Sequence, residues 1–187
     1  MEYFDDRKNV QDYIEMTKGY AGEQTLSATQ RHVAKGSRIL ELGMGPGHDL
    51  EVLKKDYSVI GSDASQIFLD IYFENHPGAQ LHHLDAVTID IPERFDCIYS
   101  NKVLHQLGDR DLSKSFQRQH QTLNSGGLAI HSFWLGKGED SHEGMRYWLR
   151  DEGEIRRLIA GLFSIIEVKT YEEFEPKDSF CITLKRV

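Results

Sequence analysis

The chain has 187 residues, of which 39% are hydrophobic and 28% are charged, and its formal net charge is −8. At about 150 residues per domain, this length predicts one domain, and the acidic balance argues against a nucleic-acid-binding protein, which would carry a basic face. A negative field favours neutral or cationic small-molecule partners.

The compartment is predicted from the N-terminus and the cysteines. The first six residues, Met1-Glu2-Tyr3-Phe4-Asp5-Asp6, are acidic and do not form a signal peptide. No apolar run approaches the roughly 20 residues of a membrane span. Cys97 and Cys181 each lie in an apolar stretch, so we expect two buried thiols and a cytoplasmic protein with no membrane partner. The oligomeric state is left open.

In chain order, the first expected elements are two helices within residues 7–34, broken at Gly19-Tyr20-Ala21-Gly22. From Ser37 onward, short apolar segments alternate with amphipathic ones. The expected strands are 38–42, 57–61, 80–84, 95–100, 128–133, 163–171 and 179–185. The expected helices between them are 48–55, 65–75, 109–123 and 152–162.

This alternation predicts a doubly wound, Rossmann-like α/β domain with three α/β/α layers around a mostly parallel, seven-stranded sheet. The last strand is expected to be antiparallel, because residues 172–178 are too few for a parallel crossover. Residues 134–150 are expected to form a loop, partly helical. Within the single domain we expect a helical preamble or lid (1–36), a cofactor-binding core (37–135) and an acceptor-side region (136–187).

A glycine-rich loop, Gly43 to Gly47, directly follows the first expected strand. Glycine permits positive φ and close approach of a ligand to the backbone. Ligands of open α/β sheets bind beyond the carboxyl ends of the strands, where this loop is expected. A dinucleotide fingerprint, G-x-G-x-x-G/A, would need glycine or alanine at position 48, which is histidine. A dinucleotide site is therefore the weaker alternative, and a simple tight turn is another.

The spacing E-x-G-x-G-x-G in Glu41 to Gly47 resembles the first motif of class I S-adenosylmethionine-dependent methyltransferases. Three later segments resemble further motifs of that family: Asp63 after the second strand, Asp85-Ala86 after the third, and Asp96 to Leu107 around the fourth. The turn Leu123 to Leu128 is similar to the family's L-x-P-G-G-x turn, with Ser125 in place of proline.

The resemblance implies S-adenosylmethionine as cofactor, with S-adenosylhomocysteine as its product. It implies that Asp63 binds the ribose hydroxyls and Asp85 the adenine amino group. The backbone NH of Ala86 would meet the adenine ring, and Ser100 and Asn101 the methionine ammonium. The full expected cofactor-binding set is Glu41, Gly43, Met44, Gly45, Gly47, Asp63, Ala64, Ser65, Asp85, Ala86, Ser100 and Asn101.

The candidate catalytic residues are His105 and His131, either of which could act as a base, and Tyr20, which could close over the cofactor. Each has a purely structural alternative. His82-His83 resembles a metal pair only by composition, because neighbours on a strand point to opposite faces, and no metal site is expected.

The acceptor pocket is expected from the preamble and an aromatic segment after the fifth strand. That segment contains Phe133, Trp134, His142, Met145, Arg146, Tyr147 and Trp148. Aromatic walls suit a small organic acceptor, although these residues could equally pack as core.

The sequence therefore predicts methyl transfer from S-adenosylmethionine to a small-molecule acceptor by in-line displacement. Two alternatives stay open, an NAD(P)-dependent oxidoreductase and a non-catalytic S-adenosylmethionine-binding protein. The acceptor molecule and atom are not predicted.

Overall fold

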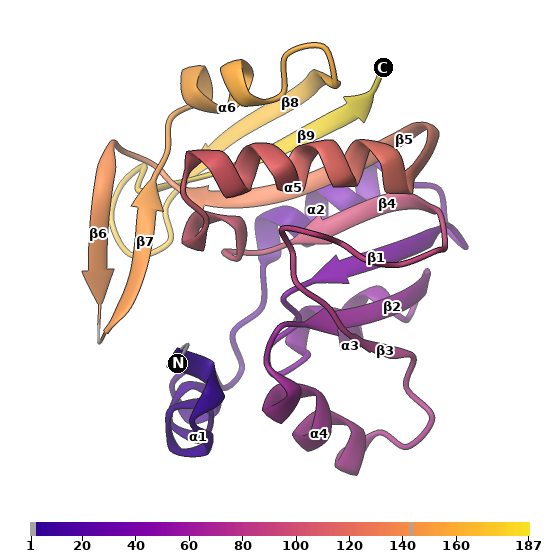
Figure 1. The fold of residues 1–187 in the computed structure, drawn as a ribbon, viewed down its shortest axis with the longest axis vertical. Coiled ribbons are helices and arrows are strands. Elements are labelled where there is room, and N and C mark those ends of the chain that lie inside the picture. The colour runs from indigo at the N-terminus through magenta and orange to yellow at the C-terminus, as the bar shows by residue number, and fades with distance from the viewer. Residues whose placement is uncertain (1–2, 143) are drawn as a thin grey trace.

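The computed structural model describes residues 3–142 and 144–187. Its main sheet has seven strands in the order β3-β2-β1-β4-β5-β9-β8 (Figure 1). The strands are β1 (Arg38–Leu42), β2 (Ser58–Asp63), β3 (Leu81–His83), β4 (Phe95–Ser100), β5 (Leu123–Trp134), β8 (Phe163–Tyr171) and β9 (Ser179–Arg186). Neighbouring strands pair in parallel except β9, which is antiparallel to both β5 and β8. The predicted mostly parallel sheet with an antiparallel last strand is confirmed.

Helices cover both faces of this sheet. They are η1 (Tyr3–Asp5), α1 (Arg7–Met16), α2 (Glu23–His32), α3 (His48–Leu53), α4 (Gln66–Asn75), η2 (Leu104–Gln106), α5 (Asp109–Thr122) and α6 (Glu152–Leu158). One buried cluster joins the sheet to α5 and α6, and a second joins its other face to α2, α3 and α4. The three-layer architecture follows from these two apolar faces.

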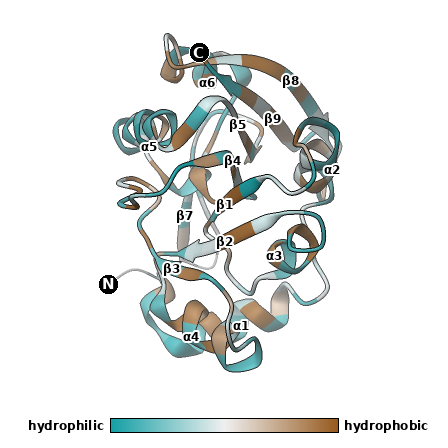
Figure 2. Cartoon of the chain, turned by 90° about the vertical axis from the view of Figure 1, so that its right-hand side faces the viewer, coloured by the Kyte–Doolittle hydropathy of each residue, from teal (hydrophilic) through white to brown (hydrophobic). Residues whose placement is uncertain are grey.

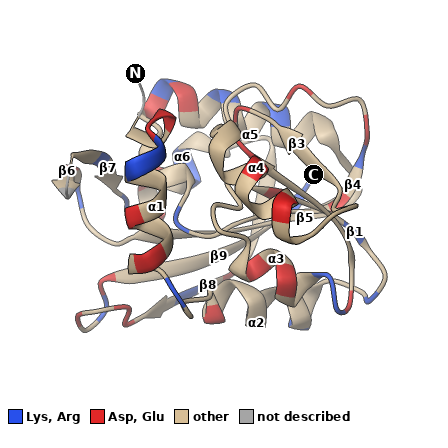
Figure 3. Ribbon diagram, turned by 90° about the horizontal axis from the view of Figure 1, so that it is seen from below, with Lys and Arg blue, Asp and Glu red and all other residues tan. Residues whose placement is uncertain are grey.

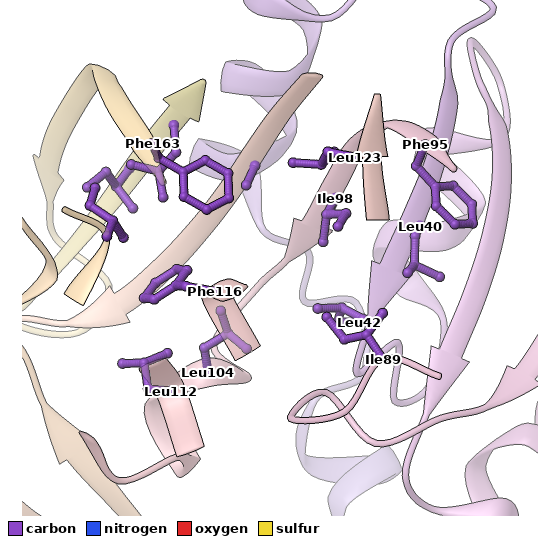
Figure 4. Packing of buried hydrophobic residues seen from close by; sticks show 14 of the residues in the cluster. Leu40, Leu42, Ile89, Phe95, Ile98, Leu104, Leu112, Phe116, Leu123 and Phe163 are labelled. Atoms are coloured by element: carbon purple, nitrogen blue, oxygen red, sulfur yellow. The ribbon is translucent and has the colours of Figure 1, made fainter. Parts of the chain in front are cut away.

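The alternation of side chains along the strands feeds both clusters. On β1, Ile39 belongs to the cluster with α2 and α3, whereas Leu40 and Leu42 belong to the cluster with α5. Figure 4 shows Leu40, Leu42 and Ile98 on one face, with Phe116 of α5 farther along the same cluster. In Figure 2 the strands are mostly hydrophobic, while α5 presents hydrophilic residues on its outer side.

The segment after β5 differs from the expected, partly helical loop. It forms an antiparallel hairpin of β6 (Gly138–His142) and β7 (Met145–Leu149). The helical expectation was wrong because Met145 to Leu149 is short and rich in residues that favour strands. Arg150 fixes the base of the hairpin: it is buried, pairs with Asp109 and donates a hydrogen bond of 2.8 Å to the carbonyl oxygen of Leu107.

The two preamble helices and their break are present, but they lie in different places. α2 packs on the sheet face within the second cluster. α1 lies at the carboxyl end of the parallel strands, on the same side as the hairpin (Figure 1). Its Tyr13 and the nearby Phe4 make ring contacts with Phe68 of α4. In the part of the chain that the structure describes, no helix is both long and apolar enough to cross a membrane.

Phe116 offers a test of the core. Its side chain is fully buried between α5 and the sheet, so we expect Phe116→Ala to lower the free energy of unfolding by about 3–5 kcal/mol. Phe73 on α4 is the matched control, because it is 49% exposed and its replacement by alanine should cost less than about 1 kcal/mol. Urea unfolding measures both values, and equal losses would contradict the assignment of the core.

Candidate active site

A cavity of about 770 Å³ lies at the carboxyl ends of β1 and β4, between α1, the hairpin and the loop that joins β8 to β9. Of the residues predicted from the sequence, it brings together Tyr20, Glu41, Gly43, Met44, Gly45, Asn101 and His105. The other predicted residues, Gly47, Asp63, Ala64, Ser65, Asp85, Ala86, Ser100 and His131, lie outside the lining of this cavity.

The glycine loop takes a conformation that only glycine adopts easily. Gly43, Gly45 and Gly47 all have positive φ, at 66°, 50° and 85°. A Cβ atom at Gly43 would stand 2.6 Å from Val103, and one at Gly47 would collide with the ring of Tyr72. At Gly45 it would meet no protein atom within 4 Å. Protein side chains therefore pack closely against Gly43 and Gly47, whereas Gly45 faces open space in the cavity.

Asp63 holds this loop from the end of β2. Its carboxylate accepts hydrogen bonds of 2.8 Å from the backbone N–H groups of Gly45 and Ser65. Burial raises the pKa of Asp63, and these backbone bonds oppose the rise. Ser65, at the N-cap position of α4, donates its hydroxyl to the carbonyl oxygen of Phe4 at 2.7 Å and makes no side-chain hydrogen bond to the helix. The N-terminal segment therefore lies over the end of β2.

Asp49, in the first turn of α3, ties the preamble to the same loop. It accepts hydrogen bonds from the backbone N–H of Gly22 at 2.7 Å and from the Tyr99 hydroxyl at 2.6 Å. Thr25 of α2 lies 2.7 Å from that hydroxyl. Burial raises the pKa of Asp49, which the bonds from Tyr99 and Gly22 oppose. The break between α1 and α2 is thus fixed at the edge of the cavity.

Glu41 differs from these two acids because one of its oxygens has no partner. It is only 2% exposed, and its Oε2 atom is buried without a hydrogen bond among the described residues. Burial, together with the charges of Asp49 and Asp63, raises its pKa well above the usual value. Because Glu41 lines the cavity, its unpaired oxygen suits a cationic or hydrogen-donating ligand.

The two candidate histidines occupy different environments. His131 is fully buried, and its ring nitrogens lie 2.8 Å from Ser100 Oγ and 2.9 Å from Gln119 Oε1. His105 lines the cavity beside Trp134 and Tyr147, and its Nδ1 atom has no partner among the described residues. Burial lowers the pKa of both imidazoles to about 3, with Lys102 contributing at His105, so both are neutral near pH 7.

Asp85 and Ala86 lie beyond the cavity. Asp85 is exposed and accepts a hydrogen bond of 2.7 Å from the backbone N–H of Val87. The carbonyl oxygen of Ala86 accepts one from Ser115. Ala64 is exposed, and its carbonyl oxygen lies 2.8 Å from His83 Nε2.

Lys102 is a prominent cavity residue that the sequence did not single out. It follows β4 with a φ of +53°, a conformation uncommon for a residue other than glycine. Its ammonium lies 3.2 Å from the ring centre of Trp134 and donates to Ser179 Oγ at 2.6 Å. Glu173 Oε2 is 3.6 Å away. Burial lowers the pKa of Lys102 to about 7, while the charge of Asp178 opposes this effect.

The loop from Glu172 to Asp178 forms the wall opposite the glycine loop. Burial raises the pKa of Asp178, but hydrogen bonds from the backbone N–H groups of Glu173, Glu175 and Phe174 outweigh it and hold the pKa at about 2. Phe174 stacks on Trp134 with ring centres 5.8 Å apart. Nothing in the local sequence marks this loop, because it reaches the cavity only through the pairing of β9 with β5.

The aromatic segment divides between the cavity and the core. Trp134, Met145, Arg146 and Tyr147 line the cavity, whereas Phe133 is fully buried against Phe180. Trp148 lies outside the lining, and the His142 side chain lies outside the described part of the structure. In residues 3–142 and 144–187, no group of three or more His, Cys, Asp or Glu side chains is arranged to hold a metal ion.

Known proteins similar to this chain are methyltransferases. A sequence-family model described as "Methyltransferase domain" matches residues 39–127. The curated trans-aconitate 2-methyltransferase of Methylobacterium nodulans is 25% identical over 146 residues, covering 76% of this chain and 56% of that protein. The chain therefore spans little more than half the length of this relative.

Solved structures with the same fold include methyltransferases with bound S-adenosylhomocysteine. The 1,6-didemethyltoxoflavin-N1-methyltransferase of Burkholderia thailandensis is 16% identical, with a TM-score of 0.77 covering 95% of this chain and 87% of that one. The N-methyltransferase NodS of Bradyrhizobium japonicum is 15% identical, with a TM-score of 0.71 covering 88% and 84%. At these identities the likeness establishes the fold.

Glu41 gives a test of the buried acid. Because its pKa is raised in the folded protein, the folded state keeps a proton that the unfolded state releases above a pKa of about 4.3. The stability that Glu41 contributes is therefore full below that pH and is lost as the pH rises toward the folded-state pKa. We expect Glu41→Gln to unfold at a higher temperature than the unmodified chain near pH 8, with the difference shrinking near pH 5. Thermal unfolding across this range measures it, and a pH-independent difference would contradict the assignment.

Proposed function

We propose that the chain is a member of the class I S-adenosylmethionine-dependent methyltransferase family and that it transfers a methyl group from S-adenosylmethionine to a small-molecule acceptor. The observation that carries this proposal is the open glycine loop beside the unpaired oxygen of Glu41. We further propose a cytoplasmic protein whose partners do not include nucleic acid, from its acidic balance and its two buried cysteines.

The residues of the cavity fit the cofactor's charge. S-adenosylmethionine supplies an electrophilic methyl group on a cationic sulfonium and also carries an ammonium. Glu41 and Asp49 line the cavity and Asp63 lies just behind the loop, so the cofactor end of the site is acidic. A cation there is favoured by Coulomb attraction in a partly desolvated site.

We assign the cofactor's positions along the loop. The backbone of Gly43 to Gly45 and the side chains of Glu41 and Asn101 face the methionine part. Asp63 and Asp85 follow β2 and β3, where the adenosyl part would lie. The segment holding Phe4 and Tyr13 now covers this region, so we propose that it moves when the cofactor enters.

Of the candidate bases, we propose His105 and not His131. His105 lines the cavity and is neutral, whereas the ring nitrogens of His131 are both engaged by protein groups away from it. Its low pKa makes His105 a weak base, so its main role is to orient the acceptor. Tyr20 also lines the cavity and is 39% exposed, and we propose that it closes over the bound substrates.

The relatives do not fix the acceptor. Trans-aconitate, the substrate in the name of the curated relative, is a tricarboxylate. Nothing in the comparisons supports a dinucleotide-dependent oxidoreductase. A non-catalytic cofactor-binding protein would share the same loop, and turnover separates that alternative from an enzyme.

We expect S-adenosylhomocysteine to bind with about 1:1 stoichiometry and to raise the melting temperature through linkage. Asp63→Asn should weaken binding by about tenfold or more, because the new amide faces the N–H groups of Gly45 and Ser65 and leaves buried donors unpaired.

The matched control is His105→Gln. It should leave the dissociation constant of S-adenosylhomocysteine within about twofold while lowering turnover. Isothermal titration calorimetry measures binding, and release of S-adenosylhomocysteine measures turnover across amines, phenols, thiols and carboxylates. A protein that does not bind S-adenosylhomocysteine at millimolar concentration would contradict the proposed function.

A further inference from the structure

We propose that the methyl acceptor is a basic amine carried on an apolar or aromatic skeleton, bound as its ammonium and methylated on nitrogen. The inference rests on the proposed function and names the substrate class of the same cavity. Three observations support it: the charges of the residues that line the cavity, the ion pairs that those residues form, and the buried atoms His105 Nδ1 and Glu41 Oε2, which have no partner among the described residues.

The lining is acidic overall. Five acidic side chains line the cavity: Glu41, Asp49, Asp140, Glu175 and Asp178, of which burial raises the pKa of Glu41 well above its usual value and also raises that of Asp49. Two lysine or arginine side chains, Lys102 and Arg146, accompany them, and burial lowers the pKa of Lys102 to about 7. Asp63 behind the loop and Glu173 beside Lys102 add to the acidic side. The field in the cavity therefore attracts cations and repels carboxylates.

Both cations are already paired. Lys102 contacts Glu173 at 3.6 Å, and Arg146 contacts Glu139 at 3.0 Å. By contrast, Asp140, Glu175 and Asp178 form no ion pair with any residue in the described ranges. Asp178 is ionised at neutral pH, since three backbone N–H groups hold its pKa at about 2. A carboxylate acceptor would have to break existing ion pairs, whereas an ammonium meets acids that form none in the described ranges.

The aromatic lining suits an organic cation. Tyr20, Tyr147 and Phe174 line the acceptor side, and Phe174 is 74% exposed at its mouth. The faces of aromatic rings attract ammonium groups. The protein already uses this interaction, because the Lys102 ammonium lies 3.2 Å from the ring centre of Trp134.

The unpaired Nδ1 atom of His105 is a second, independent indication. The residue is only 8% exposed, and burial keeps the imidazole neutral. A neutral imidazole has one nitrogen lone pair that accepts a hydrogen bond. In the tautomer with the proton on Nε2, Nδ1 accepts a hydrogen bond from an ammonium N–H. Glu41 Oε2, at the cofactor end of the cavity, is also buried without a partner among the described residues.

The transfer balances for an amine. The bound ammonium first gives one proton to water at the mouth, next to the exposed Met16 and Phe174. The nitrogen lone pair then forms the new N–C bond, and the electrons of the broken C–S bond stay on sulfur. The positive charge moves from sulfur to the methylated nitrogen, and no oxidant or further reactant is needed.

Three probes of nearly the same shape test the charge preference: phenethylamine, 2-phenylethanol and 3-phenylpropionate. An alkyl amine with a pKa of about 10 is protonated at neutral pH. We expect it to bind about tenfold tighter than the carboxylate, with the alcohol between them and with binding that weakens as salt is added. Calorimetry on the protein with and without S-adenosylhomocysteine measures this.

The matched variants remove charge without removing volume. The double variant D140N/E175Q should weaken phenethylamine binding by about threefold to tenfold, because two unpaired rim charges are lost. E172Q is the control, since Glu172 is exposed in the same loop but does not line the cavity. Binding of S-adenosylhomocysteine should be the same in all three proteins.

Three outcomes would overturn the inference. They are equal or tighter binding of 3-phenylpropionate or trans-aconitate, no binding of phenethylamine, and D140N/E175Q behaving as E172Q does. A failure of S-adenosylhomocysteine to bind would instead contradict the proposed function, and the charge preference of the cavity would still be read from the ligand-free titrations.

Discussion

The burial of three carboxylates around one glycine loop is the constraint on which the site depends. Asp63 is stabilised by the N–H groups of Gly45 and Ser65, and Asp49 by Gly22 and Tyr99. These bonds fix the loop, the preamble and α3 to one another. Glu41 has no such partner for Oε2, so the same arrangement leaves one buried oxygen for a ligand. Figure 3 shows acidic residues on α3 and α4 and both basic and acidic residues on α1, so these helices add no net positive charge to this end of the molecule.

The acceptor half of the cavity is held together by the contacts of Lys102. Lys102 connects the end of β4 with Trp134 of β5, Ser179 of β9 and Glu173 in the preceding loop. Its left-handed backbone is the kind of local strain that persists only when surrounding contacts determine it. Because the Lys102 ammonium already contacts Trp134, Ser179 and Glu173, it holds the acceptor side of the cavity together. It is therefore not a free positive charge for an acceptor.

The sequence predicted what is encoded locally. The strand Arg38 to Leu42, the glycine loop and the helix after it are contiguous, and their pattern predicted the fold and the proposed cofactor. The hairpin was missed because a five-residue strand carries too little periodicity to be distinguished from a loop. The sequence did not separate Phe133 from Trp134 as core or cavity residues. Because side chains alternate along a strand, Phe133 points into the core and Trp134 lines the cavity. The acids at 173–178 could not be predicted as site residues, because only long-range strand pairing brings them there.

The two acidic ends of the cavity have different consequences for the transfer step. In the proposed reaction, the positive charge before transfer lies on sulfur, at the end with Glu41 and Asp49. After it, the charge lies on the acceptor nitrogen, at the end with Asp178, whose ionisation three backbone N–H groups maintain. A carboxylate fixed where positive charge develops lowers the energy of the transition state more than that of the neutral nucleophile. Burial raises the pKa of Glu41 in the cofactor-free protein. A bound cationic cofactor would lower that pKa again, because a nearby positive charge favours the ionised carboxylate. The field therefore favours cofactor binding at one end of the cavity and the developing ammonium at the other, and a carboxylate acceptor would gain from neither.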